Sequence, residues 1–162
     1  ITTIYEGTTA IQSNALVGRS VLRDGGRSLG GWFDEVAATA ATLKATPDLA
    51  DMGARLDAAI ATARVASAWL VEAAAADMRV PFAASVPYLM LMGALAGGVM
   101  LGRAALAATT AIAAGEDHDG WYASKIALAA LYYGETLTDV DARWAVMRGS
   151  AAAVVAFDPA FL

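Results

Sequence analysis

A run of 23 residues without a charged side chain, from Val80 to Gly102, limits the possible folds of this chain more than any other feature. Its length is that of a membrane-spanning helix. Pro81 and Pro87 lie near its start and shorten any continuous helix. Arg103 follows at once, and neither flank carries the basic cluster that orients a membrane span. We therefore expect a buried central helix that continues to Ala114, in preference to a membrane span.

Glycines within this run favour close approach of a second helix. They form two GxxxG spacings, a pattern that occurs in membrane dimers and equally in tightly packed soluble bundles. The glycines are Gly93, Gly97, Gly98 and Gly102. Periodicity alone does not separate these two environments.

Start and stop signals predict helices before this run. A first helix begins at Thr8 or Thr9, whose hydroxyl can cap it, and buries a face made of Ile11, Ala15, Gly18 and Leu22. It ends at Asp24-Gly25-Gly26, because glycine readily takes the left-handed conformation that stops a helix. A second helix spans about 31–44 with Trp32 on its buried face. A third begins at Thr46-Pro47-Asp48, where proline suits the first turn, and continues to Arg79.

Two more helices follow the uncharged run. A polar turn at 115–120 precedes a helix of about 121–135. Thr138 with Asp141 resembles a capping box for a last helix that reaches Phe157. No stretch alternates apolar and polar residues, so we predict an all-α fold, an antiparallel bundle of about five helices preceded by the helix that ends at Gly26.

Composition excludes several classes of function. The net charge is −5 with two lysines, which leaves no basic cluster for nucleic acid. The chain has no cysteine, so disulfides, thiolate chemistry and cysteine zinc sites are excluded. No signal peptide is visible, and a cytoplasmic protein is expected. The chain begins at Ile1, without methionine, which suggests a piece of a longer protein.

Few residues of the sequence are candidates for catalysis or for binding a metal or ligand. Glu6 is one carboxylate before a helix, where the helix dipole favours any acid. His118 lies in a turn with three acids, and we expect a solvated loop there, with no metal site. The four tryptophans, Trp32, Trp69, Trp121 and Trp144, are too scattered for a ligand box and suit core packing.

The first 26 residues resemble a known family. Tyr5-Glu6-Gly7-Thr8 followed by Ile11-Gln12 is similar to the C-terminal motif of the acyl-CoA dehydrogenases. The continuation to Gly26 is similar to a bacterial subclass with an added C-terminal helical domain, which includes enzymes acting on 3-methylmercaptopropionyl-CoA. The segments that carry this second likeness are Leu16-Val17-Gly18-Arg19 and Leu22-Arg23-Asp24-Gly25-Gly26.

The resemblance implies roles for particular residues. Glu6 would be the catalytic base that removes the α-proton of an acyl-CoA thioester, while FAD accepts hydride from the β-carbon. Gly7 would allow close approach to the substrate, and Thr8 and Thr9 would lie near the FAD. Thr8 or Thr9 could equally be only a helix cap. The common family pattern has glutamine where this chain has Ala10.

The resemblance also implies an organisation and partners. Residues 1–26 would end the catalytic helical domain, and residues 27–162 would form the appended bundle. Electron-transfer flavoprotein would be the electron acceptor, and a homo-oligomer is expected. Two alternatives stay open: a stand-alone helical interaction module, and a small membrane protein built on Val80–Gly102.

Overall fold

The computed structural model describes residues 8–158 and 160, and all regular structure among them is helical. The elements are α2 (Thr9–Ala15), a π-helical turn (Leu16–Val21), a 3₁₀ turn (Leu22–Asp24), α3 (Arg27–Ala45), a 3₁₀ turn (Pro47–Leu49), α4 (Ala50–Ala76), α5 (Arg79–Ala83), α6 (Ser85–Ala113), α7 (Trp121–Gly134) and α8 (Asp139–Ala156). The predicted all-α class is therefore confirmed.

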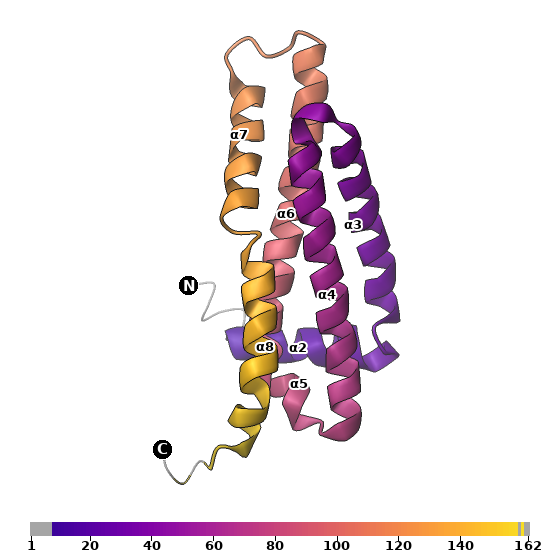
Figure 1. Cartoon of the computed structure of the whole chain (residues 1–162), viewed down its shortest axis with the longest axis vertical. Coiled ribbons are helices and arrows are strands. Elements are labelled where there is room, and N and C mark those ends of the chain that lie inside the picture. The colour runs from indigo at the N-terminus through magenta and orange to yellow at the C-terminus, as the bar shows by residue number, and fades with distance from the viewer. Residues whose placement is uncertain (1–7, 159, 161–162) are drawn as a thin grey trace.

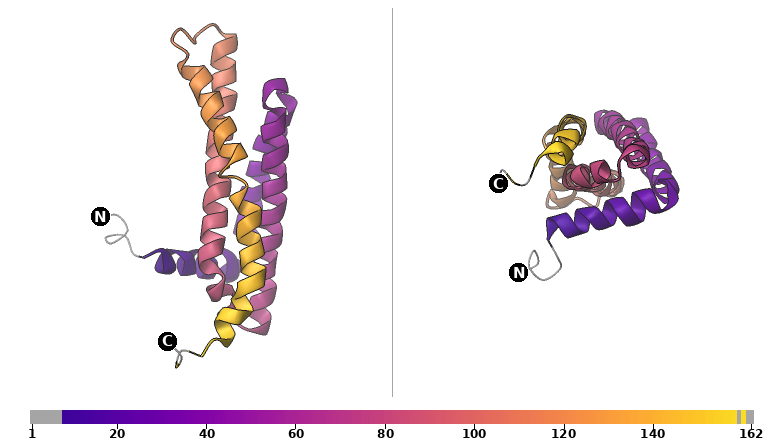
Figure 2. Two further views of the ribbon diagram at one scale, coloured as in Figure 1. Left: turned by 60° about the vertical axis from the view of Figure 1, so that its left-hand side comes forward. Right: turned by 90° about the horizontal axis from the view of Figure 1, so that it is seen from below.

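The long helices form an antiparallel bundle around α6 (Figure 1). Helix α6 is the longest, and it packs against α4, α7 and α8. Helices α7 and α8 follow one another along α6, so five long helices make a bundle with four columns (Figures 1 and 2). The predicted bundle of about five helices is confirmed, and its fifth helix extends a column instead of adding one.

Helix α2 lies across the bundle near one end, roughly perpendicular to the long axis (Figure 2). Its helical segment reaches the Gly25–Gly26 turn, where both glycines have positive φ, as the sequence predicts. The buried residues are Ser13, Val17 and Val21, which are four residues apart in the sequence, and the last two belong to the π-helical turn. The predicted buried face was wrong, because Ile11 is exposed and Ala15, Gly18 and Leu22 are only partly buried. The helix boundary is confirmed, and the division into domains at this turn stays a prediction.

Helix α6 supplies the centre of the core. One face of it is buried, and the residues are Tyr88, Leu91, Met92, Ala94, Leu95, Gly98, Val99, Gly102, Ala105 and Ala108. Helix α6 and the stretch Pro47–Ala76 are each long and apolar enough to cross a membrane by length and composition alone. The core helix of a soluble protein passes the same test, and α6 occupies such a central position here.

Tyrosines of α7 fit against the glycines of α6. The Tyr133 hydroxyl donates to the Gly98 carbonyl at 2.7 Å, and the Tyr132 hydroxyl donates to Ala94 at 3.1 Å. A Cβ at Gly102 would lie 2.5 Å from the Tyr133 oxygen, and one at Gly97 would lie closer still to the Tyr132 oxygen. Gly97 and Gly102 are therefore required for contact between α6 and α7.

Local differences from the prediction have polar causes. The helix predicted to reach Arg79 ends at Ala76, because Asp77 is extended and its carboxylate caps the Arg79 N–H at 2.9 Å. Thr138 does not form the predicted capping box; its hydroxyl donates to the Glu135 carbonyl. Asp141 instead accepts from Thr62 of α4 at 2.7 Å.

Two aromatic positions also differ. Phe33 takes the deep place on α3, and Trp32 is partly buried beside it. Trp69 and Trp144 pack edge to face with ring centres 5.8 Å apart, in line with the expected core packing. Trp121 is 54% exposed at the start of α7, so the prediction of core packing was wrong there.

Candidate functional site

The described part of the motif begins at the N-terminus of α2. The Thr8 side chain accepts a hydrogen bond from the Ile11 N–H at 3.4 Å and so caps the helix. Thr9 is the first helical residue, and both threonines are exposed. Glu6 and Gly7 lie outside the described residues, so their predicted roles, like those of Thr8 and Thr9 toward FAD, stay predictions.

A buried polar contact ties this helix to the bundle. The Ser13 hydroxyl of α2 lies 3.0 Å from the Ser85 hydroxyl of α6, and both residues are almost fully buried. Ser85 in turn donates to the Asn14 side-chain oxygen at 2.9 Å. Because buried hydroxyls are costly to leave unpaired, this cluster fixes where α2 crosses α6.

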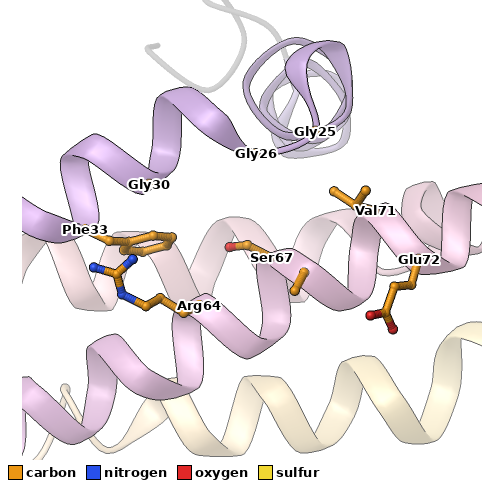
Figure 3. Close-up of a pocket in the computed structure, with 9 residues that line it drawn as sticks. Gly25, Gly26, Gly30, Phe33, Arg64, Ser67, Val71 and Glu72 are labelled. Carbon is orange, nitrogen blue, oxygen red and sulfur yellow. The ribbon is translucent and has the colours of Figure 1, made fainter.

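A cavity of about 360 Å³ lies between the Gly25–Gly26 turn, the start of α3 and the second half of α4 (Figure 3). Phe33 of α3 and Arg64, Ser67, Val71 and Glu72 of α4 line it. Gly25 and Gly26, both with positive φ, line this space at the turn before α3. The cavity is large enough for a small ligand.

Two of the polar side chains that line the cavity, Arg64 and Ser67, are already paired. Arg64 donates to Asp34 at 2.6 Å, and its guanidinium lies 5.2 Å from the centre of the Phe33 ring. Ser67 donates to the Ala63 carbonyl at 2.7 Å, so the Tyr88 hydroxyl, 2.8 Å away, donates to Ser67. Burial raises the pKa of Tyr88 to about 12, partly offset by the Ser67 hydrogen bond. Tyr88 is thus a structural phenol, not a base.

This cavity does not fit a flavin dinucleotide. A diphosphate requires unpaired donors, and the one basic side chain that lines the cavity, Arg64, is engaged by Asp34. The residues that the family resemblance connects with FAD lie at the exposed start of α2 instead. The described residues therefore hold no complete flavin site.

The loop around His118 has a structural purpose. Asp117 accepts hydrogen bonds from the Tyr122 and Ala123 N–H groups at 2.9 and 3.1 Å, and Asp119 accepts from the Trp121 N–H at 3.1 Å. These acids cap α7. Within residues 8–158 and 160, no three His, Asp or Glu side chains gather in a group that could hold a metal ion.

Sequence reasoning missed the Ser13–Ser85 contact and the cavity. The two serines are 72 residues apart, and each looks like an ordinary helix residue. A usable signal was that Ser13 falls four residues before Val17 and eight before Val21, within an otherwise apolar stripe. The cavity depends on the angle between α2 and α3, which no local pattern specifies.

The described residues form an all-α bundle, and its first helix, α2, follows the Tyr5-Glu6-Gly7-Thr8 motif in the sequence. Residues 32–158 match the sequence profile of the family described as "Acetyl-CoA dehydrogenase C-terminal like". Over 143 residues the chain is 42% identical to a 3-methylmercaptopropionyl-CoA dehydrogenase of Ruegeria pomeroyi. The chain belongs to the acyl-CoA dehydrogenase family and corresponds to its C-terminal domain.

The match to this relative has unequal coverage. It takes in 86% of this chain and 24% of the relative. The chain therefore spans about a quarter of the length of the curated relative that it matches. The match therefore does not by itself assign the activity of a whole dehydrogenase to this chain.

Proposed function

We propose that the chain is the C-terminal part of an FAD-dependent acyl-CoA dehydrogenase that introduces an α,β double bond into an acyl-CoA thioester. The observation that carries this proposal is the 42% identity over 143 residues to a dehydrogenase of an acyl-CoA. The motif Tyr5-Glu6-Gly7-Thr8, which resembles the catalytic motif of the family, also supports it.

Glu6 is the base in this proposal. A carboxylate in a pocket closed by substrate has a raised pKa, which is better matched to a weakly acidic carbon than a solvated carboxylate. Glu6 would take the α-proton of the thioester, and Gly7 would leave room for the substrate beside it. FAD, when bound, supplies a hydride acceptor for the β-carbon. Thr8 and Thr9 would lie near that cofactor.

The bundle would hold the motif in place. Ser13 and Asn14 come seven and eight residues after Glu6 in the sequence and contact Ser85 of α6. Through this contact the bundle fixes the direction of the helix that Glu6 precedes. In the full enzyme the bundle would also support subunit contacts or shape the acyl pocket, electron-transfer flavoprotein would reoxidise the flavin, and the location would be cytoplasmic.

The test uses the full-length enzyme with Glu6→Gln. This variant should bind flavin normally and lose exchange of the substrate α-proton with solvent, because the amide cannot accept that proton. Exchange is measured by deuterium incorporation into an acyl-CoA. Glu72→Gln, a matched change in the cavity on α4, should leave exchange intact. Exchange retained by Glu6→Gln removes Glu6 as the base.

The 162-residue chain alone should not bleach FAD in the presence of acyl-CoAs, because its described cavity does not fit the dinucleotide. Turnover by this chain would contradict the proposal that it is one part of the enzyme. A stand-alone helical interaction module is the second candidate, favoured by the complete apolar core of residues 17–151. An upstream reading frame without a flavin domain would decide for it.

A further inference from the structure

One hydroxyl of α6 lies between two consecutive residues of α2. The Ser85 hydroxyl donates to the Asn14 Oδ1 atom at 2.9 Å and lies 3.0 Å from the Ser13 hydroxyl. Since Ser85 gives its single proton to Asn14, the proton of the Ser13–Ser85 contact comes from Ser13, which also donates to the Ala10 carbonyl at 2.9 Å. The hydrogen bonds therefore run from Ser13 through Ser85 to Asn14. Contacts to two neighbouring residues fix the position of Ser85 along α2 and the rotation of α2 about its own axis.

Ser85 does not stabilise the end of its own helix. It is the first residue of α6, where several backbone N–H groups have no partner within the helix. Serine hydroxyls near a helix start commonly accept from such groups. Within the described residues, however, no side chain caps this end of α6, and the Ser85 hydroxyl bonds α2 instead. Ser85 is 2% exposed, so water does not compete for this hydroxyl.

Helix α2 depends on this contact for its order. It has seven residues, Thr9–Ala15, and isolated helices of fewer than about 12 residues are marginal in water. Ser13 and Asn14 both favour caps and turns over the interior of a helix. Ser13 is also the residue of α2 that is buried. The bonds to Ser85 therefore hold a helix whose own sequence supports it weakly.

The first turn of α2 directly follows the motif. Thr8 caps this turn, and Glu6 comes two residues before Thr8 in the sequence. We propose that Ser85 and Asn14 are positioning residues for Glu6, which act through α2 on the rate of α-proton removal and do not touch the substrate. A displacement of a reacting group by about 1 Å lowers a rate ~100-fold. This inference rests on the proposed function and assigns part of its rate to a hydroxyl of the bundle.

Full-length enzyme with Asn14→Ala, Asn14→Asp or Ser85→Ala tests the inference. The measured quantities are the rate constant of flavin reduction and the acyl-CoA concentration that half-saturates it, with butyryl-CoA, octanoyl-CoA and 3-methylmercaptopropionyl-CoA. Asn14→Ala and Ser85→Ala should each lower the rate constant roughly 10- to 100-fold and change the half-saturating concentration by less than about twofold. Asn14→Asp should keep the rate constant within about twofold, because a carboxylate oxygen still accepts from Ser85.

Ser67→Ala is the matched control. Ser67 is also nearly buried, and its hydroxyl lies 2.8 Å from that of Tyr88 on another helix. This variant should lose stability and keep the rate of flavin reduction. The variant with both Asn14→Ala and Ser85→Ala should be about as slow as Ser85→Ala alone, since both changes remove the same bond.

The outcomes separate this inference from the proposed function. Unchanged rates in Asn14→Ala and Ser85→Ala overturn the inference, as does equal slowing by Ser67→Ala or by Asn14→Asp. Asn14→Ala decides the question if Ser85→Ala does not fold, because Asn14 is exposed and its truncation leaves the core intact. When Glu6→Gln loses α-proton exchange while the other variants keep full rates, only the positioning role falls. Exchange retained by Glu6→Gln removes Glu6 as the base, and the role of Ser85 falls with it.

Discussion

The contact between Gly102 and Tyr133 shows how single residues set the spacing of this bundle. The Tyr133 hydroxyl donates to the Gly98 carbonyl at 2.7 Å, which holds the ring over Gly102. A Cβ at Gly102 would lie 2.5 Å from that oxygen and 2.9 Å from the Leu43 Cδ1 atom. Since the hydrogen bond restrains the tyrosine, the contact cannot relax without loss. The GxxxG spacing therefore serves packing within the chain at this position.

Gly102→Ala should destabilise the fold. Overpacking of a core costs about 1–3 kcal/mol. The better helix propensity of alanine returns up to ~1 kcal/mol, so we expect a net loss of about 1–2 kcal/mol. Urea denaturation measures it.

The matched control is Gly149→Ala in α8, where nothing lies within 4 Å of the new Cβ. This variant should be neutral or more stable by up to ~1 kcal/mol, since only the helix propensity changes. Equal effects of the two substitutions would show that Tyr133 does not limit the space at Gly102.

At the scale of elements, helix ends that rest on backbone preference could be predicted from sequence. Gly25 and Gly26 end the first helical segment through positive φ, and Pro47 begins the turn before α4. Helix ends that depend on which of several partners a side chain binds could not be predicted from sequence. Thr138 and Asp141 carry the signature of a capping box, yet Asp141 bonds Thr62 of α4, 79 residues away. The spacing of residues within the segment does not show that Thr62, on another helix, competes for the Asp141 carboxylate.

The candidate site divides in the same way. The motif around Glu6 can be recognised in the sequence because its residues are contiguous. The Ser13–Ser85 contact, which ties that motif to the bundle, joins two distant elements and was not predictable. Such contacts depend on the angles at which helices cross, and the hydrophobic periodicity of a sequence does not determine those angles.

The α2–α6 contact predicts a local effect of Ser85→Ala. Removal of the hydroxyl takes this partner from Ser13 and Asn14, while Ser13 still donates to the Ala10 carbonyl, so the cost is about 0.5–1.5 kcal/mol. The loss should appear mainly as faster amide hydrogen exchange in α2, while α4 and α7 keep their protection. Ser150→Ala, which removes only a hydroxyl bonded to the Val146 carbonyl within α8, should not change exchange in α2. Uniformly faster exchange in every helix after Ser85→Ala would refute a specific anchor.

For the molecule as a whole, buried phenols link stability to high pH. Burial raises the pKa of Tyr88 to about 12, and burial together with the neighbouring Tyr132 raises that of Tyr133. Both are neutral acids in the folded state, with folded pKa values above the unfolded one. Their contribution is fully present below the unfolded pKa near 10 and is lost as the pH rises through the folded value.

The chain should therefore lose stability between pH ~10 and ~12. A shift of about two units at Tyr88 corresponds to roughly 2–3 kcal/mol. Tyr88→Phe should be less stable near neutral pH by about 1 kcal/mol, because Ser67 loses its partner, and should decline less steeply above pH ~10. Urea denaturation of both proteins across this range measures the two slopes. If the unmodified chain and Tyr88→Phe decline in parallel, Tyr88 keeps an ordinary pKa in the folded state, and the packing of α4 against α6 at Ser67 admits water.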